Sequence, residues 1–162
     1  MNLRPLSLIA GLLLLAACSQ NPSNTGAGAN TGAGNATTQS QVAPGSKEDF
    51  IQNVGDRVFF DFDKSVVKPE GQQTLQRQAE WLKRYPNVTV TIEGHCDERG
   101  TREYNLALGE RRATAVQRAL VALGVQANRV RTISYGKERP QCTEADEACY
   151  QKNRRVHLSA GQ

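Results

Sequence analysis

The sequence predicts an α/β fold, a two-layer sandwich in which helices pack on one side of a single sheet. Two kinds of segment follow one another along the chain. In one kind apolar and polar residues alternate, which is the period of a half-buried strand. In the other, apolar residues recur every three or four positions, which is the period of one helix face. The order of these segments is β-α-β-α-β-(α)-β. Residues 47–162, which contain them, are enough for one small hydrophobic core.

The first strand and the first helix are predicted between positions 57 and 84. Residues 57–62 alternate, with Val58, Phe60 and Phe62 expected on one face. Pro69 suits the first turn of the helix that follows. The residues predicted to form the buried stripe of this helix are Leu75, Ala79 and Leu82.

A second strand and a long helix come next. Residues 88–95 alternate again, with Val88, Val90 and Ile92 expected to point inward. The helix begins at about Glu103 and ends before Gly124, because glycine is typical of a helix end. One face of this helix carries apolar or small residues at three- and four-residue steps: Leu106, Gly109, Ala113, Val116, Leu120 and Leu123.

The C-terminal part of the chain predicts two more strands. They cover residues 130–135 and 154–159, and Val156 and Leu158 are expected to point inward in the second. A short helix is predicted between them, over residues 144–152.

The N-terminus predicts a secretory signal and a lipid anchor. Arg4 precedes an apolar run that is too short to span a bilayer, which needs roughly 20 residues. Leu15-Ala-Ala-Cys18 resembles a bacterial lipobox, in which the cysteine thiol is lipidated and becomes the new N-terminus. An ordinary signal with a chance cysteine is the alternative. We predict a signal peptide over residues 1–17 and lipidation of Cys18.

Residues 18–46 predict a flexible tether. They contain no charged residue and almost no large apolar one, and the sequence NTGAG occurs in them twice. Such a segment cannot bury enough surface to offset the entropy lost on ordering. The folded domain is therefore predicted over residues 47–162.

The charge distribution argues against a nucleic-acid-binding protein. The formal net charge is only +4, and all acidic residues lie beyond Ser46 together with nearly all basic ones. A nucleic-acid reader needs a basic stripe or aromatic residues that stack on bases, and the sequence shows neither.

Three cysteines remain besides Cys18. Cys142 and Cys149 are close in sequence, and in an oxidising compartment they predict a local disulfide. Metal binding is the alternative, although the spacing matches no zinc pattern. Cys96 is predicted to be a small buried residue. A nucleophilic pair with His95 is disfavoured, because adjacent strand residues point to opposite faces.

The segment 94–113 is the most informative about function. It places Asp97 at the end of the second predicted strand and Arg112 on the helix that follows, with Asn105 about two turns earlier on the same flank. A guanidinium can bind a carboxylate at two points, and a carboxylate accepts hydrogen bonds from an ammonium. The segment therefore indicates a site for a ligand that carries both groups. A loop role, in which Asp97 caps its own backbone, is the alternative.

Four motifs resemble those of the OmpA-like peptidoglycan-binding family and occur in the family's order. They are GHCDERGTREYNLALGERRA at 94–113, FFDFDK at 59–64, YGKERP at 135–140 and NRR at 153–155. The resemblance covers residues 56–159. Cys96 departs from it, since the family usually has a small residue such as Thr or Ala there.

The resemblance implies a mixed sheet with a ligand cleft beside the Asp97 loop and the long helix. Asp97 would take the ammonium of diaminopimelate in the peptidoglycan stem peptide, and Arg112 its carboxylate. The other residues implied as peptidoglycan-binding are Asn105, Leu108, Asp63, Phe62 and Thr101.

Three roles stay open at this point. Phe62 belongs either to the core or to the cleft. Asn153 and Arg154 either orient the site loop or contact the ligand. Arg99 is a weaker candidate on the loop itself.

The resemblance also implies a location and partners. It implies a lipoprotein anchored at the periplasmic face of the outer membrane, and Ser19 in place of an aspartate after the cysteine agrees with outer-membrane sorting. The implied partners are peptidoglycan, through which the protein links the membrane to the cell wall, and TolB with other proteins of the Tol envelope system, which serves envelope integrity and cell division.

A wall hydrolase is the alternative from another functional class. It would need paired carboxylates, such as Asp97 with Glu98, or a metal held by His95 and His157. No hydrolase motif is present. The sequence therefore favours a non-enzymatic binding module without cofactor or metal.

Overall fold

The computed structural model describes residues 42–161. The predicted signal peptide, Cys18 and most of the predicted tether lie outside the described residues. In chain order the elements are α1 (Lys47–Asp49), a π-helical turn (Phe50–Val54), β1 (Arg57–Phe59), α2 (Pro69–Arg84), β2 (Thr89–His95), α3 (Arg102–Ala122), a 3₁₀ turn (Ala127–Arg129), β3 (Val130–Gly136), α4 (Glu147–Asn153) and β4 (Arg155–Gly161). None of the helices within this part of the chain has the length and apolar character to cross a membrane.

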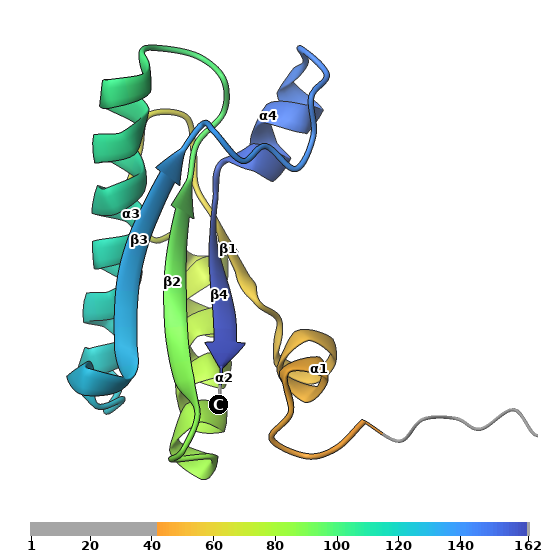
Figure 1. Ribbon diagram of the computed structural model, residues 1–162, viewed down its shortest axis with the longest axis vertical. Helices are drawn as coiled ribbons and strands as arrows, with labels where there is room; N and C mark the ends of the chain where they lie inside the picture. The colour runs from red at the N-terminus through yellow and green to blue at the C-terminus, as the bar shows by residue number, and fades with distance from the viewer. Residues whose placement is uncertain (1–41, 162) are drawn as a thin grey trace, which may run out of the picture. The chain divides into compact units, whose positions relative to one another are not determined.

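The strands form one mixed sheet in the order β1-β4-β2-β3. The two pairings of β4, with β1 and with β2, are antiparallel, whereas β2 and β3 run parallel. Parallel neighbours require a crossover, and α3 supplies it (Figure 1). The predicted α/β order and the mixed sheet are confirmed.

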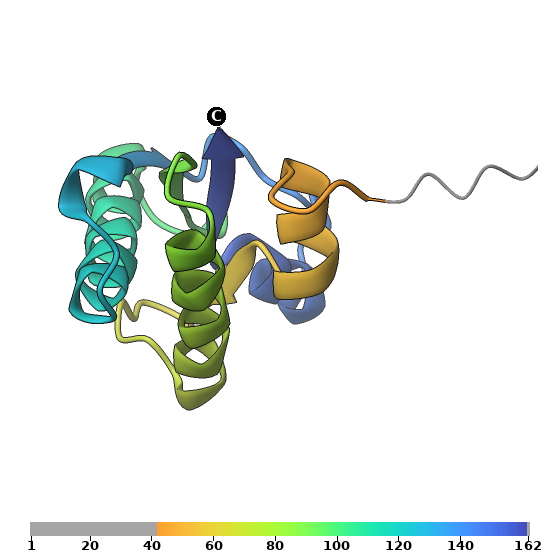
Figure 2. The ribbon, with the colours of Figure 1, turned by 90° about the horizontal axis from the view of Figure 1, so that it is seen from below.

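Helices α2 and α3 cover one face of this sheet, as Figure 2 shows from below. The core between the layers contains the inward residues of the strands, among them Val90, Ile92 and Leu158. The predicted stripe of α2 is confirmed, because Leu75, Ala79 and Leu82 are all buried. Within the described residues, the buried residues of the core cluster all lie between Phe50 and Leu158, so residues 42–162 include this core.

The segment before β1 also joins the core, which the sequence pattern did not predict. Phe50 is fully buried, and its ring packs on Trp81 with a centroid distance of 4.9 Å. The indole Nε1 of Trp81 donates to Asp49 at 2.8 Å, while Ser46 caps α1 through the backbone N–H of Asp49. This segment is too short for a helical period to be visible in the sequence.

The first strand is shorter than predicted. It ends at Phe59, although the backbone N–H of Phe60 still donates to Arg154 O at 2.9 Å. The chain then turns, and Asp63 adopts a positive φ of 55°. The prediction that Phe62 shares one strand face with Val58 and Phe60 is wrong, because Phe62 lies beyond the end of the strand and is 55% exposed, whereas Val58 and Phe60 are buried.

A glycine pair fixes the distance between β2 and α3 near the functional end of the sheet. A Cβ on Gly94 would lie 2.0 Å from the carbonyl oxygen of Gly109, so the strand and helix backbones touch directly. This contact sets where the first turns of α3 lie relative to the loop after β2.

We therefore expect Gly94→Ala to destabilise the domain by about 1–3 kcal/mol, because the helix must move away from the strand. Urea unfolding of residues 42–162 measures this. Gly161→Ala is the matched control, since a Cβ there meets only Thr89 Oγ1, at 3.8 Å. Equal and small changes in both variants would contradict the close-packing argument.

Candidate functional site

A cavity of about 180 Å³ lies beyond the end of β2, between the loop after β2, the start of α3 and the segment after β1. Just before the cavity, the chain leaving β2 is still held to the end of β3 by the bond from Cys96 N to Gly136 O at 2.8 Å. The lining residues are Phe62, Asp63, Cys96, Asp97, Arg99, Gly100, Tyr104, Asn105, Leu108, Arg112 and Arg154. Six of the seven predicted peptidoglycan-binding residues therefore line one cavity.

Asp97 is the central acidic group of the cavity and is only 4% exposed. Its Oδ1 accepts from the backbone N–H and the Nε of Arg99, at 3.1 and 3.2 Å. Its Oδ2 accepts from Nη2 of Arg99 at 2.5 Å and from Nη1 of Arg154 at 3.3 Å. Burial alone would raise the pKa of Asp97, but these bonds outweigh it and lower the pKa below the usual 3.8. Asp97 is therefore ionised at neutral pH.

Arg99 covers the carboxylate from the solvent side. Its guanidinium lies between two aromatic rings, 4.0 Å from the Phe62 centroid and 4.5 Å from that of Tyr150. The Tyr150 hydroxyl donates to Glu98 at 2.8 Å. The Arg99 side chain is nevertheless 36% exposed, so it is the more exposed of the two arginines that bind Asp97.

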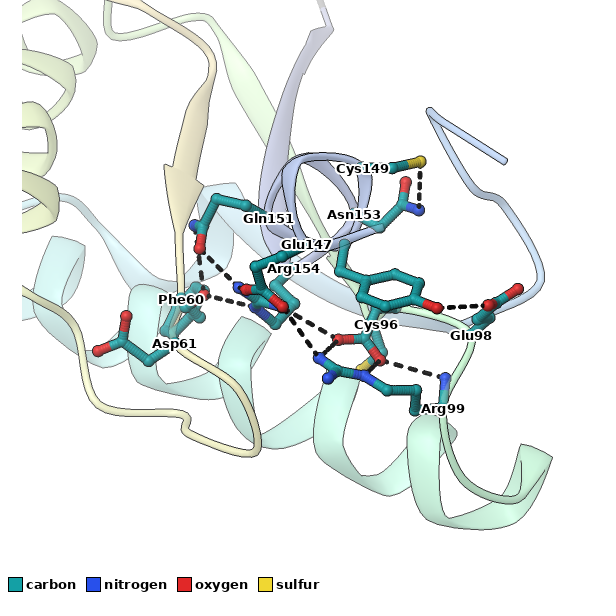
Figure 3. A network of polar contacts seen from close by, with 12 residues as sticks. Phe60, Asp61, Cys96, Glu98, Arg99, Glu147, Cys149, Gln151, Asn153 and Arg154 are labelled. Atoms are coloured by element: carbon teal, nitrogen blue, oxygen red, sulfur yellow. Dashed lines mark hydrogen bonds and ion pairs between the residues drawn. The ribbon is translucent and has the colours of Figure 1, made fainter. Parts of the chain in front are cut away.

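Arg154 holds Asp97 from the protein side and is 3% exposed. Figure 3 shows it at the centre of a polar network. Its Nε donates to Phe60 O at 3.2 Å, and its Nη2 donates to Gln151 at 2.7 Å and to Glu147. The guanidinium of Arg154 therefore orients the Asp97 carboxylate, and Arg154 also lines the cavity.

Arg112 reaches the cavity from α3 but is fully buried. Its Nε donates to Lys64 O at 2.8 Å, its Nη1 to His95 O at 2.8 Å, and its Nη2 to Asp61 O at 3.0 Å. Nη1 also lies 3.5 Å from Cys96 Sγ. Since a guanidinium has five N–H donors, these contacts leave one of them, on Nη2. The predicted two-point grip on a carboxylate therefore requires Arg112 to release one of these four partners.

Asn105 and Thr101 shape the loop that carries Asp97. The side-chain amide of Asn105 donates to the carbonyls of Arg99 and Thr101, at 2.8 and 2.9 Å. Thr101 lies outside the cavity lining and caps α3 by accepting from the backbone N–H of Tyr104 at 3.2 Å. The structure thus places Thr101 at a helix end, where its contacts organise the loop.

The rest of the cavity lining includes buried Leu108 and three exposed residues, Phe62, Asp63 and Tyr104. The Tyr104 hydroxyl donates to the Asp63 carboxylate, which raises the pKa of Tyr104. Sequence reasoning had no signal for Tyr104, because an aromatic residue in the first turn of a helix is usually a packing residue.

Cys96 and His95 do not form a nucleophilic pair. The Cys96 thiol donates to Asn105 O at 3.4 Å, and burial raises its pKa to about 11, so it is a neutral thiol. His95 packs on the Tyr135 ring, with 5.5 Å between centroids. Burial lowers the pKa of His95 to about 4, so its approach to Glu93 at 3.7 Å is not an ion pair at neutral pH.

Cys142 and Cys149 form a disulfide in the structure. Glu144 lies beside both sulfur atoms, a grouping that would suit a metal ion if the two thiols were free. In the disulfide each sulfur is bonded to the other, so neither is a thiolate ligand.

Comparison with known proteins gives relatives along most of the chain. The model of the OmpA family matches residues 59–154. A protein called peptidoglycan-associated lipoprotein from Rhizobium meliloti (strain 1021) is 55% identical over 146 residues, 89% of this chain and 80% of the relative. A protein of the same name from Legionella pneumophila is 41% identical, over 93% of this chain and 90% of that one.

Solved structures resemble this one in fold. The crystal structure of the peptidoglycan-associated lipoprotein from Burkholderia pseudomallei is 46% identical with a TM-score of 0.64, covering 65% of this chain and 90% of that one. The C-terminal domain of Helicobacter pylori MotB has a TM-score of 0.62 at 22% identity, covering 66% of this chain and 84% of that one, and shows the fold alone.

Proposed function

The chain belongs to the OmpA family, and we propose that it is a non-enzymatic lipoprotein that binds peptidoglycan through the diaminopimelate of the stem peptide. The observation that carries this proposal is the buried, ionised Asp97 carboxylate in a cavity lined by three arginines, Arg99, Arg112 and Arg154. A carboxylate that stays charged while buried can bind an ammonium, and the arginines can bind a carboxylate. Diaminopimelate presents both groups at the end of one side chain.

Asp97 has no spare acceptor position in this arrangement. A carboxylate offers about four lone-pair sites, and Arg99 and Arg154 together donate four hydrogen bonds to them. An incoming ammonium must therefore replace a donor. Arg99 is the exposed partner and Arg154 the buried one, so we expect Arg99 to swing aside while Arg154 keeps the carboxylate in place. The displaced guanidinium is then free to meet the ligand's carboxylate.

The relatives named peptidoglycan-associated lipoprotein support the lipid anchor at Cys18. We place the anchored protein at the periplasmic face of the outer membrane, where the anchor and the domain together would link membrane and wall. We propose that the docking surface for TolB overlaps the cavity. Soluble stem peptide and TolB should then compete for the protein.

Calorimetric titration of residues 42–162 with a diaminopimelate-containing stem peptide tests the proposal. The lysine analogue of the peptide, which lacks the second carboxylate, is the matched control. We expect the analogue to bind about tenfold more weakly or worse, because it loses at least one charge-assisted hydrogen bond, which contributes roughly 1.5–3 kcal/mol. Equal affinity for both peptides would refute recognition of the paired charges, and binding of neither would refute the proposed ligand.

A further inference from the structure

Helix α4 supports the site although it is not one of the two helices, α2 and α3, that cover the sheet. Tyr150 stacks on the Arg99 guanidinium and donates to Glu98. Glu147 and Gln151 accept from Arg154, which follows the helix directly and holds Asp97. Displacing α4 would therefore remove contacts from both arginines that bind the Asp97 carboxylate.

What holds α4 itself is unusual. It has seven residues, far fewer than a helix needs to persist alone in water. Its buried residues are Cys149 and Asn153, and neither is part of the hydrophobic core cluster. Packing of an apolar face, the usual support of a short helix, therefore contributes little.

Both buried residues of α4 hold the same short stretch of backbone. Cys149 is joined to Cys142 by the disulfide. Asn153 accepts from the backbone N–H groups of Gln141 and Cys142, at 2.8 and 3.2 Å, and donates to Cys142 O at 2.7 Å. The loop and the helix form one cross-linked unit, in which Cys142 is the common attachment point. Asp146 adds a cap by accepting from Cys149 N at 2.7 Å.

We propose that the Cys142–Cys149 disulfide is a positioning element of the ligand site, so that its reduction loosens α4 and lowers affinity for the stem peptide. The inference rests on the proposed function for its ligand. With the cross-link intact, α4 keeps Arg154 and Tyr150 in the places from which they hold Asp97 and Arg99. With it broken, the Asp146 cap, the Asn153 bonds and the contacts of Glu147, Tyr150 and Gln151 remain without a covalent link, and the helix opens locally at a lower cost in free energy.

The covalent step is thiol–disulfide exchange with a dithiol reductant. A thiolate of the reductant attacks Cys142 Sγ, the more accessible sulfur, since Cys149 is 2% exposed. The S–S bond breaks, and Cys149 leaves as a thiolate that takes up a proton. The second thiol of the reductant then releases Cys142 and closes the reductant's own disulfide. The protein gains two electrons and two protons.

The test compares oxidised and reduced residues 42–162, a stretch that excludes Cys18 and contains the core cluster of the described residues. Titration with the diaminopimelate stem peptide should give about tenfold weaker binding after reduction by dithiothreitol, the effect of losing one charge-assisted hydrogen bond. The double variant Cys142→Ser with Cys149→Ser should bind like the reduced protein, and dithiothreitol should leave it unchanged. The second comparison excludes an effect of the reductant on buried Cys96.

Amide hydrogen exchange supplies a readout that needs no ligand. Reduction should speed exchange in α4 and at the Arg99 amide, which donates to Asp97, and leave the amides of β2 and α3 unchanged. A purely structural disulfide would instead change protection across the whole domain. Unchanged exchange at Arg99 together with unchanged affinity overturns the inference. If the oxidised protein binds no stem peptide but exchange responds, the positioning role stands and the proposed ligand is wrong.

Discussion

Replacing Arg112 by methionine should lower the free energy of unfolding of residues 42–162 by about 2–4 kcal/mol. The guanidinium is fully buried and donates to the carbonyls of Asp61, Lys64 and His95. It thereby ties the segment after β1 to the end of β2. Methionine fills much of the volume but leaves these acceptors without a donor, and each unsatisfied buried group costs about 1–3 kcal/mol, less where water reaches it. Urea unfolding of both proteins measures the difference.

The neighbouring Arg111 is the matched control, because it is exposed on the same helix. Arg111→Ala should change stability by no more than about 0.5 kcal/mol. If Arg112→Met kept full stability and lost only the ligand, Arg112 would act on the ligand's carboxylate alone, and the buried hydrogen bonds would contribute nothing measurable. Loss of stability together with loss of binding is the result that the geometry predicts.

The regular elements of the fold could be predicted from the sequence, whereas its short turns could not. Periodicity predicted the strands, the two long helices and their order, since burial of one face imposes a period of two or about 3.6. It failed where the segment was too short to show a period, as in the turn that contains Phe50, and at the end of β1. There Asp63 turns the chain, so that Phe62 lies at the cavity and not in the core.

The site was predicted as a set of residues but not as a set of contacts. Spacing on α3 and resemblance to the family brought Asp97, Asn105 and Arg112 together, and all three line the cavity. The sequence could not show that backbone carbonyls already accept from three of the five N–H donors of Arg112. The residue pattern of a helix flank is the same whether the flank faces a cavity or a buried turn. Nor could the sequence show that Arg154, distant in sequence, holds Asp97.

Asp97→Asn should weaken binding of the diaminopimelate stem peptide by at least about tenfold. The substitution keeps the side chain's shape but removes the charge that attracts the ammonium. It also leaves Arg99 and Arg154 without their carboxylate, and the positive field that results repels an ammonium. Calorimetric titration at neutral pH, with circular dichroism to confirm that the variant is folded, measures the loss.

The pH dependence of binding separates the charge of Asp97 from its shape. Because hydrogen bonds lower the pKa of Asp97 in the folded protein, the carboxylate stays ionised as pH falls to the ordinary value of 3.8, and the charge is lost only below it. Wild-type affinity should therefore persist to about pH 4 and then fall, while the weak binding of Asp97→Asn should show no such step. Asp61→Asn is the control, since Asp61 pairs with Lys68 outside the cavity. If Asp61→Asn weakened binding as much as Asp97→Asn did, the attraction would come from the overall charge of the domain, and the cavity would have no special role.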